Sequence, residues 1–383
     1  MTILFATDHY PPHVNGIVRH VIMLQDELRK RGHRVLILTP RVTKTQKTGD
    51  DIFYLPSVKT YTHADDALAV PYNRKLEQQI LALKPDIVHS HLFFSGFMAT
   101  RIAKKLKIPS VVTIHTFVSQ YFAWMLPRAQ AFTRPIADAV TRNYYNRFDL
   151  ILAPSLKAVD ELEHAHVSAK IDHFPNAIDQ KIAQKITDKD FYEKWDINPR
   201  HPLSIIVGSL EKAKNIDVAI KSWALVVRKF PEAHLAILGD GTQRPALEKM
   251  TAELQLQNNI IFTGFVDPNM IASANHAADV VFFTSDTDNF PTVLIEALTA
   301  HKPIVAVDDK AVVDLVIPGK NGELAPKDPV MLAEKICDLL SDDVKRLEYG
   351  KESAKMAKQF SIEEYVNKLE DIYTNLITAQ KNS

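Results

Sequence analysis

Short apolar runs alternate with longer helical patterns along this chain, and this alternation constrains its fold more than any other feature. In the first half, the apolar run ILFAT is followed by the amphipathic stretch GIVRHVIMLQDELRKRG and then by RVLILTP. Such alternation of strand and helix predicts a parallel, doubly wound sheet. The pattern starts again with LSIIVGSL and continues through HLAILGDG, NIIFTG, DVVFFTS and KPIVAV. We therefore expect two Rossmann-like α/β domains.

The boundary between the two domains is predicted near residues 176–189. Asparagine and proline interrupt the alternating pattern there, in and after HFPNAIDQ. A chain of 383 residues is long enough for two such domains. The sequence thus predicts an N-terminal domain over residues 1–180 and a C-terminal domain over 181–360. The last segment, FSIEEYVNKLEDIYTNL, predicts a helix over 361–378 that packs back onto the first domain.

Composition excludes several classes of protein. With 46% hydrophobic and 24% charged residues, and 46 basic against 46 acidic side chains, the chain is neither disordered nor a nucleic-acid tail. Its 11 glycines form no G-x-G-x-x-G and no G-x-x-x-x-G-K-[ST], which disfavours a nicotinamide dehydrogenase and a P-loop nucleotide site. Residues 1–180 carry 22 basic and 16 acidic side chains, so we expect this part to prefer anionic partners.

Cysteine and histidine usage gives no reason to expect a metal. The single cysteine, Cys337, excludes an intramolecular disulfide and a thiolate zinc cluster. His89 and His91 lie two apart on a predicted strand, where packed or solvated histidines are commoner than metal ligands. The N-terminus lacks the regions of a signal peptide, and no stretch is long and apolar enough to span a membrane. These features predict a cytoplasmic protein with at most peripheral contact, at the inner face of the cell membrane.

The segment SDTDNFPTVLIEALTAHK, residues 285–302, carries the most chemical information. A strand ends there in a polar loop that holds Asp288, and a helix that begins at Pro291 holds Glu296. Both carboxylates are expected at the carboxyl ends of the strands, where open α/β sheets bind ligands. Carboxylates bind sugar hydroxyls strongly, and amides at a helix N-terminus suit a diphosphate. The alternative is that Asp288 is a solvated loop residue and Glu296 an acid favoured by the helix dipole.

This segment resembles the E-x7-E region of retaining glycosyltransferases of family 4, written E-x-F-[GP]-x-x-x-x-E-A. Further motifs follow in that family's order: YPPHVNG at 10–16, TIHT at 113–116, FPNAID at 174–179, VGSLEKAKNID at 207–217 and LGDGT at 238–242. Together they span nearly the whole chain. The resemblance implies an α/β fold of GT-B architecture, in which two Rossmann-like domains with parallel sheets face an interdomain cleft.

The resemblance also implies a reaction and the residues that carry it. Members of the family transfer a sugar from a nucleotide sugar with retention of configuration and without a metal or another cofactor, and the donor's own phosphate takes the acceptor proton. The implied catalytic residues are His115 on the acceptor side, Asp288 at the donor sugar and Lys214 at the diphosphate. Glu296 would hold the ribose. The other implied donor-site residues are Gly16, Gly208, Ser209, Phe265, Val266, Asn289, Phe290, Pro291, Thr292 and Val293.

The sequence departs from the family pattern at two positions. The first acid of the pair is Asp288 rather than glutamate, which shortens the side chain by one methylene. Ser209 stands where the family has an arginine beside Gly208, so one charge that would neutralise the diphosphate is absent. Lys212 is a candidate substitute, although a lysine cannot reproduce the bidentate arginine fork. A weak or silent glycosyltransferase-like binding protein is therefore one alternative.

Aromatic residues and arginines are interleaved between Phe117 and Arg147. This pattern suits a helix lying in an anionic membrane interface, and it favours a lipid acceptor, as in the family's diacylglycerol glucosyltransferases. The alternative is that the apolar residues are ordinary core and the arginines a solvated face. The membrane and acceptor candidates are Phe122, Trp124, Met125, Arg128 and Arg134.

We therefore predict a hexosyltransferase that moves glucose from UDP-glucose to a membrane lipid such as diacylglycerol. A soluble, cell-wall or polysaccharide acceptor is the alternative within the same enzyme class. The predicted partners are a nucleotide sugar, a lipid acceptor and an anionic membrane surface. Nucleic acid is not among them, because no nucleic-acid-binding motif is present.

Overall fold

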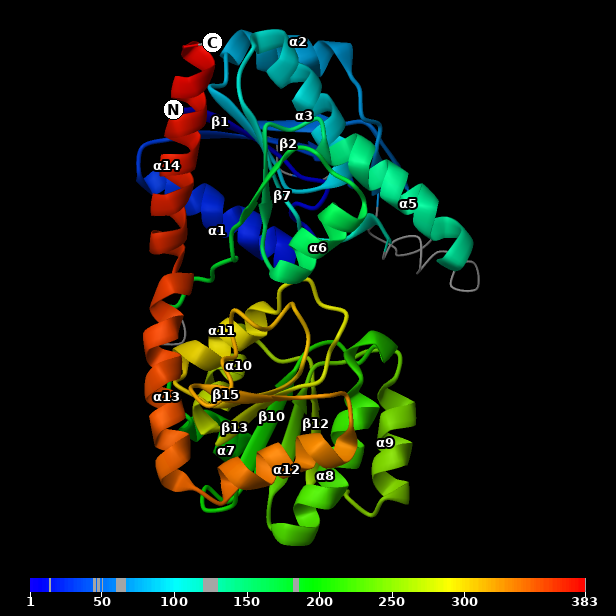
Figure 1. Cartoon of the computed structure of the whole chain (residues 1–383), viewed down its shortest axis with the longest axis vertical. Helices are drawn as coiled ribbons and strands as arrows, with labels where there is room; N and C mark the ends of the chain where they lie inside the picture. Colours follow the sequence, from blue (N-terminus) through cyan, green and yellow to red (C-terminus); the bar gives the residue numbers. More distant parts are fainter. Residues whose placement is uncertain are drawn as a thin grey trace. The chain divides into compact units, whose positions relative to one another are not determined.

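The chain folds into two compact units, each built on its own parallel sheet (Figure 1). The computed structural model describes residues 1–13, 15–43, 46, 49, 51–59, 67–119, 130–181 and 186–382. The first unit comprises Met1–Asn176 together with Ile362–Ser383, and the second comprises Ala177–Ser361. The two Rossmann-like α/β domains that the alternating pattern predicts are thus confirmed.

The first unit contains a seven-stranded sheet in the order β3-β2-β1-β6-β7-β8-β9, in which every neighbouring pair is parallel. Alternate residues of β1, Leu4 and Ala6, pack with Met98 and Ile102 of α3 in one hydrophobic core. The strands are β1 (Thr2–Ala6), β2 (Arg34–Pro40), β3 (Ile52–Leu55), β6 (Ile87–Ser90), β7 (Ser110–Thr113), β8 (Leu150–Ala153) and β9 (Lys170–His173), beside a short antiparallel pair, β4 (Ser57–Lys59) and β5 (Ala67–Ala69). The helices are α1 (Gly16–Lys30), α2 (Arg74–Leu83), α3 (Phe93–Leu106), α5 (Gln130–Tyr145), α6 (Leu156–His164) and α14 (Ile362–Lys381).

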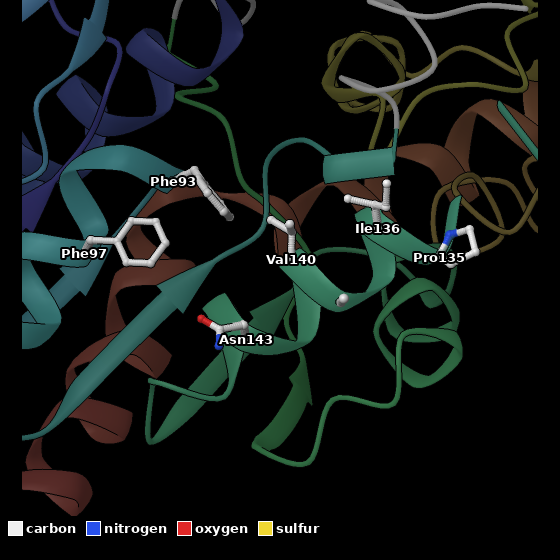
Figure 2. A pocket seen from close by; sticks show the side chains of 7 residues that line it. Phe93, Phe97, Pro135, Ile136, Val140 and Asn143 are labelled. Atoms are coloured by element: carbon white, nitrogen blue, oxygen red, sulfur yellow. The ribbon is translucent and has the colours of Figure 1, made fainter. Parts of the chain in front are cut away.

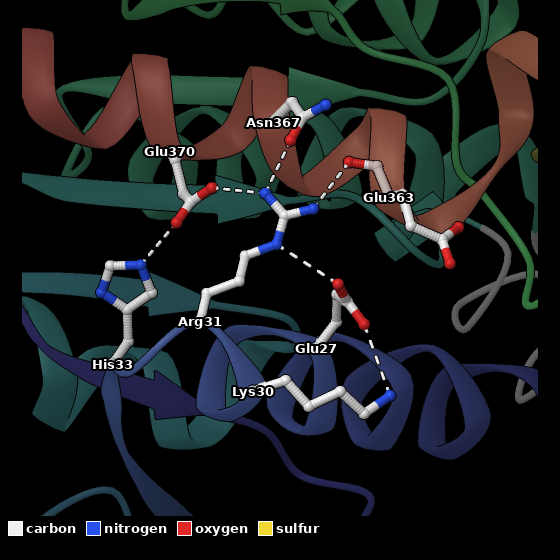
Figure 3. Close-up of polar contacts among 7 residues, drawn as sticks. All are labelled: Glu27, Lys30, Arg31, His33, Glu363, Asn367 and Glu370. Carbon is white, nitrogen blue, oxygen red and sulfur yellow. Dashed lines mark hydrogen bonds and ion pairs between the residues drawn. The ribbon is translucent and has the colours of Figure 1, made fainter.

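Helix α14, drawn in red in Figure 1, ends the chain but belongs to the first unit, where it packs against α1. Figure 3 shows the polar contacts that join the two helices around Arg31. The Arg31 guanidinium donates to Asn367 Oδ1 and to Glu370 Oε2, both at 2.6 Å. His33 Nε2 lies 2.6 Å from the second carboxylate oxygen of Glu370. Further along α14, the fully buried Tyr373 places its hydroxyl 2.5 Å from His89 Nδ1 on β6.

The second unit contains a six-stranded parallel sheet in the order β12-β11-β10-β13-β14-β15. Alternate residues of its strands pack into two hydrophobic cores, one on each face of the sheet. Leu235 and Ile237 of β11 pack in a core with Trp223 of α8, whereas Ala236 and Leu238 pack in a second core with Leu294 of α11. Helices therefore cover both faces of the sheet, which is why its strands read as continuous apolar runs in the sequence.

The elements of the second unit take the following bounds. The strands are β10 (Leu203–Val207), β11 (His234–Leu238), β12 (Ile260–Gly264), β13 (Val280–Phe283), β14 (Ile304–Val307) and β15 (Gly322–Ala325). The helices are α7 (Lys189–Trp195), α8 (Ile216–Lys229), α9 (Arg244–Glu253), α10 (Pro268–Ala277), α11 (Thr292–Thr299), α12 (Pro329–Leu340) and α13 (Asp343–Ala357), with short 3₁₀ helices η3 (Lys212–Lys214) and η4 (Lys358–Phe360).

Each sheet has one point at which the strand order reverses direction. In the first unit this point lies between β1 and β6, and in the second it lies between β10 and β13. Loops that leave neighbouring strands at such a point diverge to opposite faces of the sheet and open a crevice, where ligands bind in folds of this kind. Within the described part of the chain, we find no helix with the length and apolar character needed to cross a membrane.

Candidate functional site

In the second unit, the loops that follow β10 and β13 are joined by hydrogen bonds at the reversal point of the sheet. Thr284 Oγ1 donates to the carbonyl oxygen of Lys214 at 2.8 Å. In the opposite direction, the side-chain amide of Asn215 donates to the Thr284 carbonyl at 3.1 Å and to Asp286 Oδ1 at 2.8 Å. Asn215 adopts a left-handed backbone conformation with φ of 53°, which asparagine tolerates better than most residues. These contacts fix the two loops relative to each other.

The structure brings together two of the residues that the resemblance implies, Lys214 and Asp288. Lys214 Nζ lies 2.7 Å from Asp288 Oδ1, although the residues are 74 positions apart in the sequence. Both side chains are about one-quarter exposed, so the ion pair is partly accessible to solvent rather than enclosed in the core. The other carboxylate oxygen, Asp288 Oδ2, is buried and has no hydrogen-bond partner among the described residues. The lysine is therefore already oriented, and one strong acceptor beside it remains available.

Helix α11 begins immediately after the Asp288 loop. Asn289, Phe290 and Pro291 are buried, and the helix starts at Thr292 without a side-chain cap. The Leu294 amide donates to the Pro291 carbonyl at 3.0 Å, whereas the amides of Thr292 and Val293 precede the first intrahelical hydrogen bond, which makes this terminus suitable for an anion. Thr292 and Val293 in that turn are half-buried. Glu296 is the fifth residue of the helix and is also half-buried, so both carboxylates of the E-x7-E segment lie on elements that leave the same edge of the sheet.

The turn LGDGT packs directly against the start of the β10 loop. Gly208 donates its backbone N–H to the Leu238 carbonyl, and Leu210 donates to the Asp240 carbonyl. Gly239 has a φ of +143°, and a Cβ at this position would lie 1.9 Å from the Gly208 carbonyl oxygen. Only glycine allows this approach. Ser209, the position of the missing arginine, is exposed.

Two further residues of the implied donor site follow β12 at the same edge of the sheet. Phe265 is 83% exposed, the highest exposure of any large hydrophobic residue in the described part of the second unit. Val266 is half-buried beside it. An exposed aromatic ring at the ligand-binding edge of a sheet provides a flat apolar surface on which a planar group such as a nucleobase can stack.

In the first unit, His115 follows β7 and lies near the point where the strand order reverses. Its Nε2 atom is 3.3 Å from His91 Nδ1, and its ring centroid is 5.1 Å from that of His20 on α1. Burial is the main cause of an unusually low pKa for His115 and His91, and it lowers the pKa of His20 to about 4. These rings are therefore neutral at physiological pH. Gly16 is the first residue of α1, and a Cβ there would meet no described atom within 4 Å, so no close approach among the described residues requires glycine at this position.

Sequence reasoning missed His20 and gave His91 no role. His20 lies on the buried face of α1 with Val21 and Leu24, and nothing in the sequence distinguishes it from an ordinary core position. His91 was visible only as one of two histidines on a strand. The other, His89, is a satisfied core residue: Nδ1 contacts the Tyr373 hydroxyl, and Nε2 lies 2.8 Å from Thr113 Oγ1.

An apolar groove lies between α3 and α5 of the first unit (Figure 2). Its cavity volume is about 500 Å³, and Ile136 in its wall is 54% exposed. The guanidinium of Arg147 lies 5.0 Å from the centre of the Phe97 ring, so a basic group lies beside the groove. Single exposed apolar residues are common, but several that line one concave surface indicate a binding site for an apolar group. The lining residues are Phe93, Phe97, Pro135, Ile136, Ala139, Val140 and Asn143.

The predicted membrane and acceptor candidates fall partly outside the described residues. This is the case for Phe122, Trp124, Met125 and Arg128. Arg134 is described, and its guanidinium forms ion pairs with Asp138 at 2.8 Å and with Glu161 at 3.1 Å. Its charge is therefore offset locally.

Comparison with known protein families identifies both halves of the chain. The model described as "Glycosyltransferase Family 4" matches residues 14–181, and the model described as "Glycosyl transferases group 1" matches residues 187–356. The chain is a glycosyltransferase with a family 4 domain and a group 1 domain. It is therefore an enzyme of the hexosyltransferase type, and the family 4 domain agrees with the retaining transfer that the motifs imply.

Several curated proteins resemble this glycosyltransferase over most of its length. An alpha-monoglucosyldiacylglycerol synthase from Acholeplasma laidlawii is 25% identical, with 98% of each chain covered. One with the same description from Streptococcus pneumoniae is 26% identical, covering 80% of this chain and 71% of that protein. A GDP-mannose-dependent alpha-mannosyltransferase from Mycolicibacterium smegmatis is also 26% identical, with 86% and 85% covered.

Solved structures agree on the fold. Sucrose-phosphate synthase from Thermosynechococcus elongatus aligns with a TM-score of 0.77 at 19% identity and 99% coverage of both chains. Anabaena Alr3699/HepE in complex with UDP-glucose aligns with a TM-score of 0.75 at 19% identity, covering 98% of this chain and all of the other. The GT-B architecture implied by the motifs is thus confirmed.

Proposed function

We propose that this glycosyltransferase moves a hexose, glucose in the first place, from UDP-glucose to a membrane lipid such as diacylglycerol, with retention of the anomeric configuration. The observation that carries the lipid acceptor is the similarity over 98% of the chain to an alpha-monoglucosyldiacylglycerol synthase. The apolar groove between α3 and α5 supports it, because its lining has the chemistry of an acyl-chain site. Work at a lipid would make the enzyme a peripheral protein at the inner face of the cell membrane.

The proposed donor site is the crevice at the reversal point of the second sheet. The Lys214 ammonium and the first amides of α11 would stabilise the negative charge that develops on the departing diphosphate. Asp288 Oδ2 is an available acceptor for a hydroxyl of the donor sugar, and Glu296 would hold the ribose. The base would lie against Phe265 and Val266. In this proposal the donor's phosphate takes the acceptor proton, and no metal or other cofactor takes part.

In the first unit, His115 is the proposed acceptor-side residue. Its ring is neutral at physiological pH, because burial lowers its pKa, so it can donate one hydrogen bond to a sugar hydroxyl. Gly16 remains a proposed donor-side contact on the resemblance alone. Its open surroundings leave room for a ligand to approach the α1 terminus.

A soluble acceptor is the second candidate within the same enzyme class. Glycogen synthase from Mycobacterium tuberculosis is 26% identical over 89% of this chain, so the acceptor varies among relatives at the same level of identity. A silent binding protein is the third, motivated by Ser209. Against it, the Lys214–Asp288 ion pair and the uncapped α11 terminus keep the anion-binding chemistry in place.

Binding of UDP should separate the roles of the two carboxylates. We expect Glu296→Ala to weaken UDP binding by roughly 10- to 100-fold. This factor corresponds to the free energy of about 1.5–3 kcal/mol that a hydrogen bond to a charged group contributes. Asp288→Ala should leave UDP affinity within about threefold, because Asp288 would contact the sugar and no part of UDP, and Lys214, released from its ion pair with Asp288, keeps its charge for the diphosphate. Isothermal calorimetry with UDP measures both. Unchanged UDP affinity in the Glu296 variant would contradict its assignment to the ribose.

Vesicle binding tests the lipid acceptor. The protein should cosediment with vesicles that contain anionic lipid, and Ile136→Ser should weaken this binding by roughly 10- to 100-fold, because a single buried apolar side chain contributes about 1.5–3 kcal/mol. Val58→Ser is the matched control, since Val58 on β4 of the same unit is 64% exposed and is not among the residues that line the groove. Absence of vesicle binding at low salt, together with transfer to a soluble sugar, would favour the second candidate.

A further inference from the structure

Two buried histidines and one half-buried histidine meet at the carboxyl edge of the first sheet, each from a different segment. His20 comes from α1, His91 from the end of β6 and His115 from the end of β7. Each ring offers one nitrogen such that the three nitrogens lie within 4.8 Å of one another. The strand order explains why these segments are neighbours. Helix α1, which carries His20, follows β1, and β1 pairs with β6, which precedes His91. Strand β7, which precedes His115, pairs with the other side of β6.

Two nitrogens of this trio have no hydrogen-bond partner among the described residues. They are Nε2 of His20, whose residue is 6% exposed, and Nε2 of His91, which is fully buried. A buried polar atom without a partner costs about 1–3 kcal/mol. The neighbouring His89 demonstrates that this core can satisfy a buried histidine, because both of its nitrogens have hydroxyl partners. A ligand that accepts imidazole lone pairs would satisfy His20, whereas His91 would bind it through its other nitrogen, Nδ1, which faces His115 Nε2 at 3.3 Å.

The spacing of the trio suits a transition metal. Zinc binds imidazole nitrogens at about 2.0–2.1 Å in tetrahedral geometry, which sets neighbouring ligand nitrogens about 3.3 Å apart. The distance between His91 Nδ1 and His115 Nε2 is already 3.3 Å, and the His20 nitrogen, within 4.8 Å of both, would move closer when the ion binds. His115 is half-buried, so the cluster has a route to solvent through that ring. The trio contains no carboxylate, and imidazole ligands favour zinc, copper, nickel or iron over magnesium and calcium.

We propose that His20, His91 and His115 bind a divalent transition-metal ion, Zn²⁺ in the first place, through three imidazoles with a fourth position open to water. This is the ligand set of three histidines and one solvent molecule found at open zinc sites. The ion takes no part in sugar transfer. Because it occupies His115, it should inhibit the enzyme reversibly, and this consequence rests on the proposed function of His115.

Metal binding is tested directly on the full-length protein without an affinity tag, after removal of metals with EDTA. Calorimetric titration with ZnCl₂ should give one equivalent bound. His20→Ala should weaken this binding by roughly 100-fold or more, since loss even of an outer partner of a metal ligand costs 10- to 100-fold. His164→Ala is the matched control, because His164 lies in the same unit but its side chain is 62% exposed on α6. That variant should bind zinc as the parent protein does.

Two further measurements keep the test decisive. Circular dichroism verifies that the His20 variant is folded. If that variant is unfolded, His91→Ala is used in its place. Titration with Co²⁺ should produce the visible absorption of a four-coordinate nitrogen site in the parent protein and in His164→Ala only. The proposal is overturned if the parent protein binds less than one equivalent of zinc at micromolar concentration, or if the His20 and His164 variants bind it equally.

The outcome is distinguishable from a failure of the proposed function. Zinc binding needs neither donor nor acceptor, so a lack of transferase activity would leave the metal site intact. Conversely, absence of zinc binding would leave UDP binding to the second unit unchanged. In active protein, micromolar Zn²⁺ should inhibit transfer, EDTA should restore it, and the His20 variant should lose this inhibition whatever its basal rate. Inhibition that persists in the His20 variant would assign the effect to another site.

Discussion

Replacing Lys214 with alanine should lower the rate of sugar transfer by roughly 10²- to 10³-fold, the cost of removing one oriented group that stabilises charge in a transition state. The lysine is held in position before any ligand binds, because its ammonium lies 2.7 Å from Asp288 Oδ1. A charge that is already oriented needs no rearrangement when the diphosphate departs. The loss should appear mainly in kcat, since the negative charge grows during the reaction.

Lys212→Ala is the matched control for this experiment. Lys212 lies in the same 3₁₀ helix, but its side chain is exposed. We expect its loss to change kcat by less than about fivefold, as is usual for an exposed side chain outside the reacting centre. Initial rates with UDP-glucose and diacylglycerol in mixed vesicles measure both variants. An equal loss in the two would mean that Lys212 substitutes for the arginine absent at Ser209, and no loss in Lys214→Ala would contradict the assigned role.

Much of the fold could be predicted from the sequence because parallel strands covered on both faces must be apolar throughout. The runs at β10, β11 and β13 carry that signature, and helical periodicity between them leaves few other arrangements. The pairing of Lys214 with Asp288 was beyond such reasoning. It depends on β13 lying beside β10 rather than beside β12, and strand order is a property of the whole sheet.

The histidine trio was also beyond prediction, for a different reason. A histidine on the apolar face of an amphipathic helix, such as His20, carries no local signal that it will meet another ring. The two-residue spacing of His89 and His91 predicts only that both point to the same side of one strand. The structure separates their environments, because hydroxyls from β7 and α14 satisfy His89, whereas His91 lies beyond the strand end and faces His115.

Helix α14 explains why the first unit requires the end of the chain. Its residue Tyr373 is fully buried, its hydroxyl contacts His89, and the Arg31 cluster anchors the preceding turns of the helix. We expect Tyr373→Ala to lower the free energy of unfolding of this unit by about 3–5 kcal/mol, as for other buried aromatic residues replaced by alanine. Tyr373→Phe keeps the ring and removes only the hydroxyl, so it should cost about 1–3 kcal/mol.

Urea unfolding followed by circular dichroism measures both variants of Tyr373, with Tyr72→Ala as the control. Tyr72 belongs to the same unit but is 45% exposed, so its replacement should cost less than about 1 kcal/mol. If Tyr373→Ala unfolded at the same urea concentration as Tyr72→Ala, the packing of α14 would contribute little to the stability of the first unit. The expected order of stability, Tyr72→Ala above Tyr373→Phe above Tyr373→Ala, instead requires that the last helix completes the core around β6. The N-terminal domain would then reach full stability only after the C-terminal end of the chain has docked.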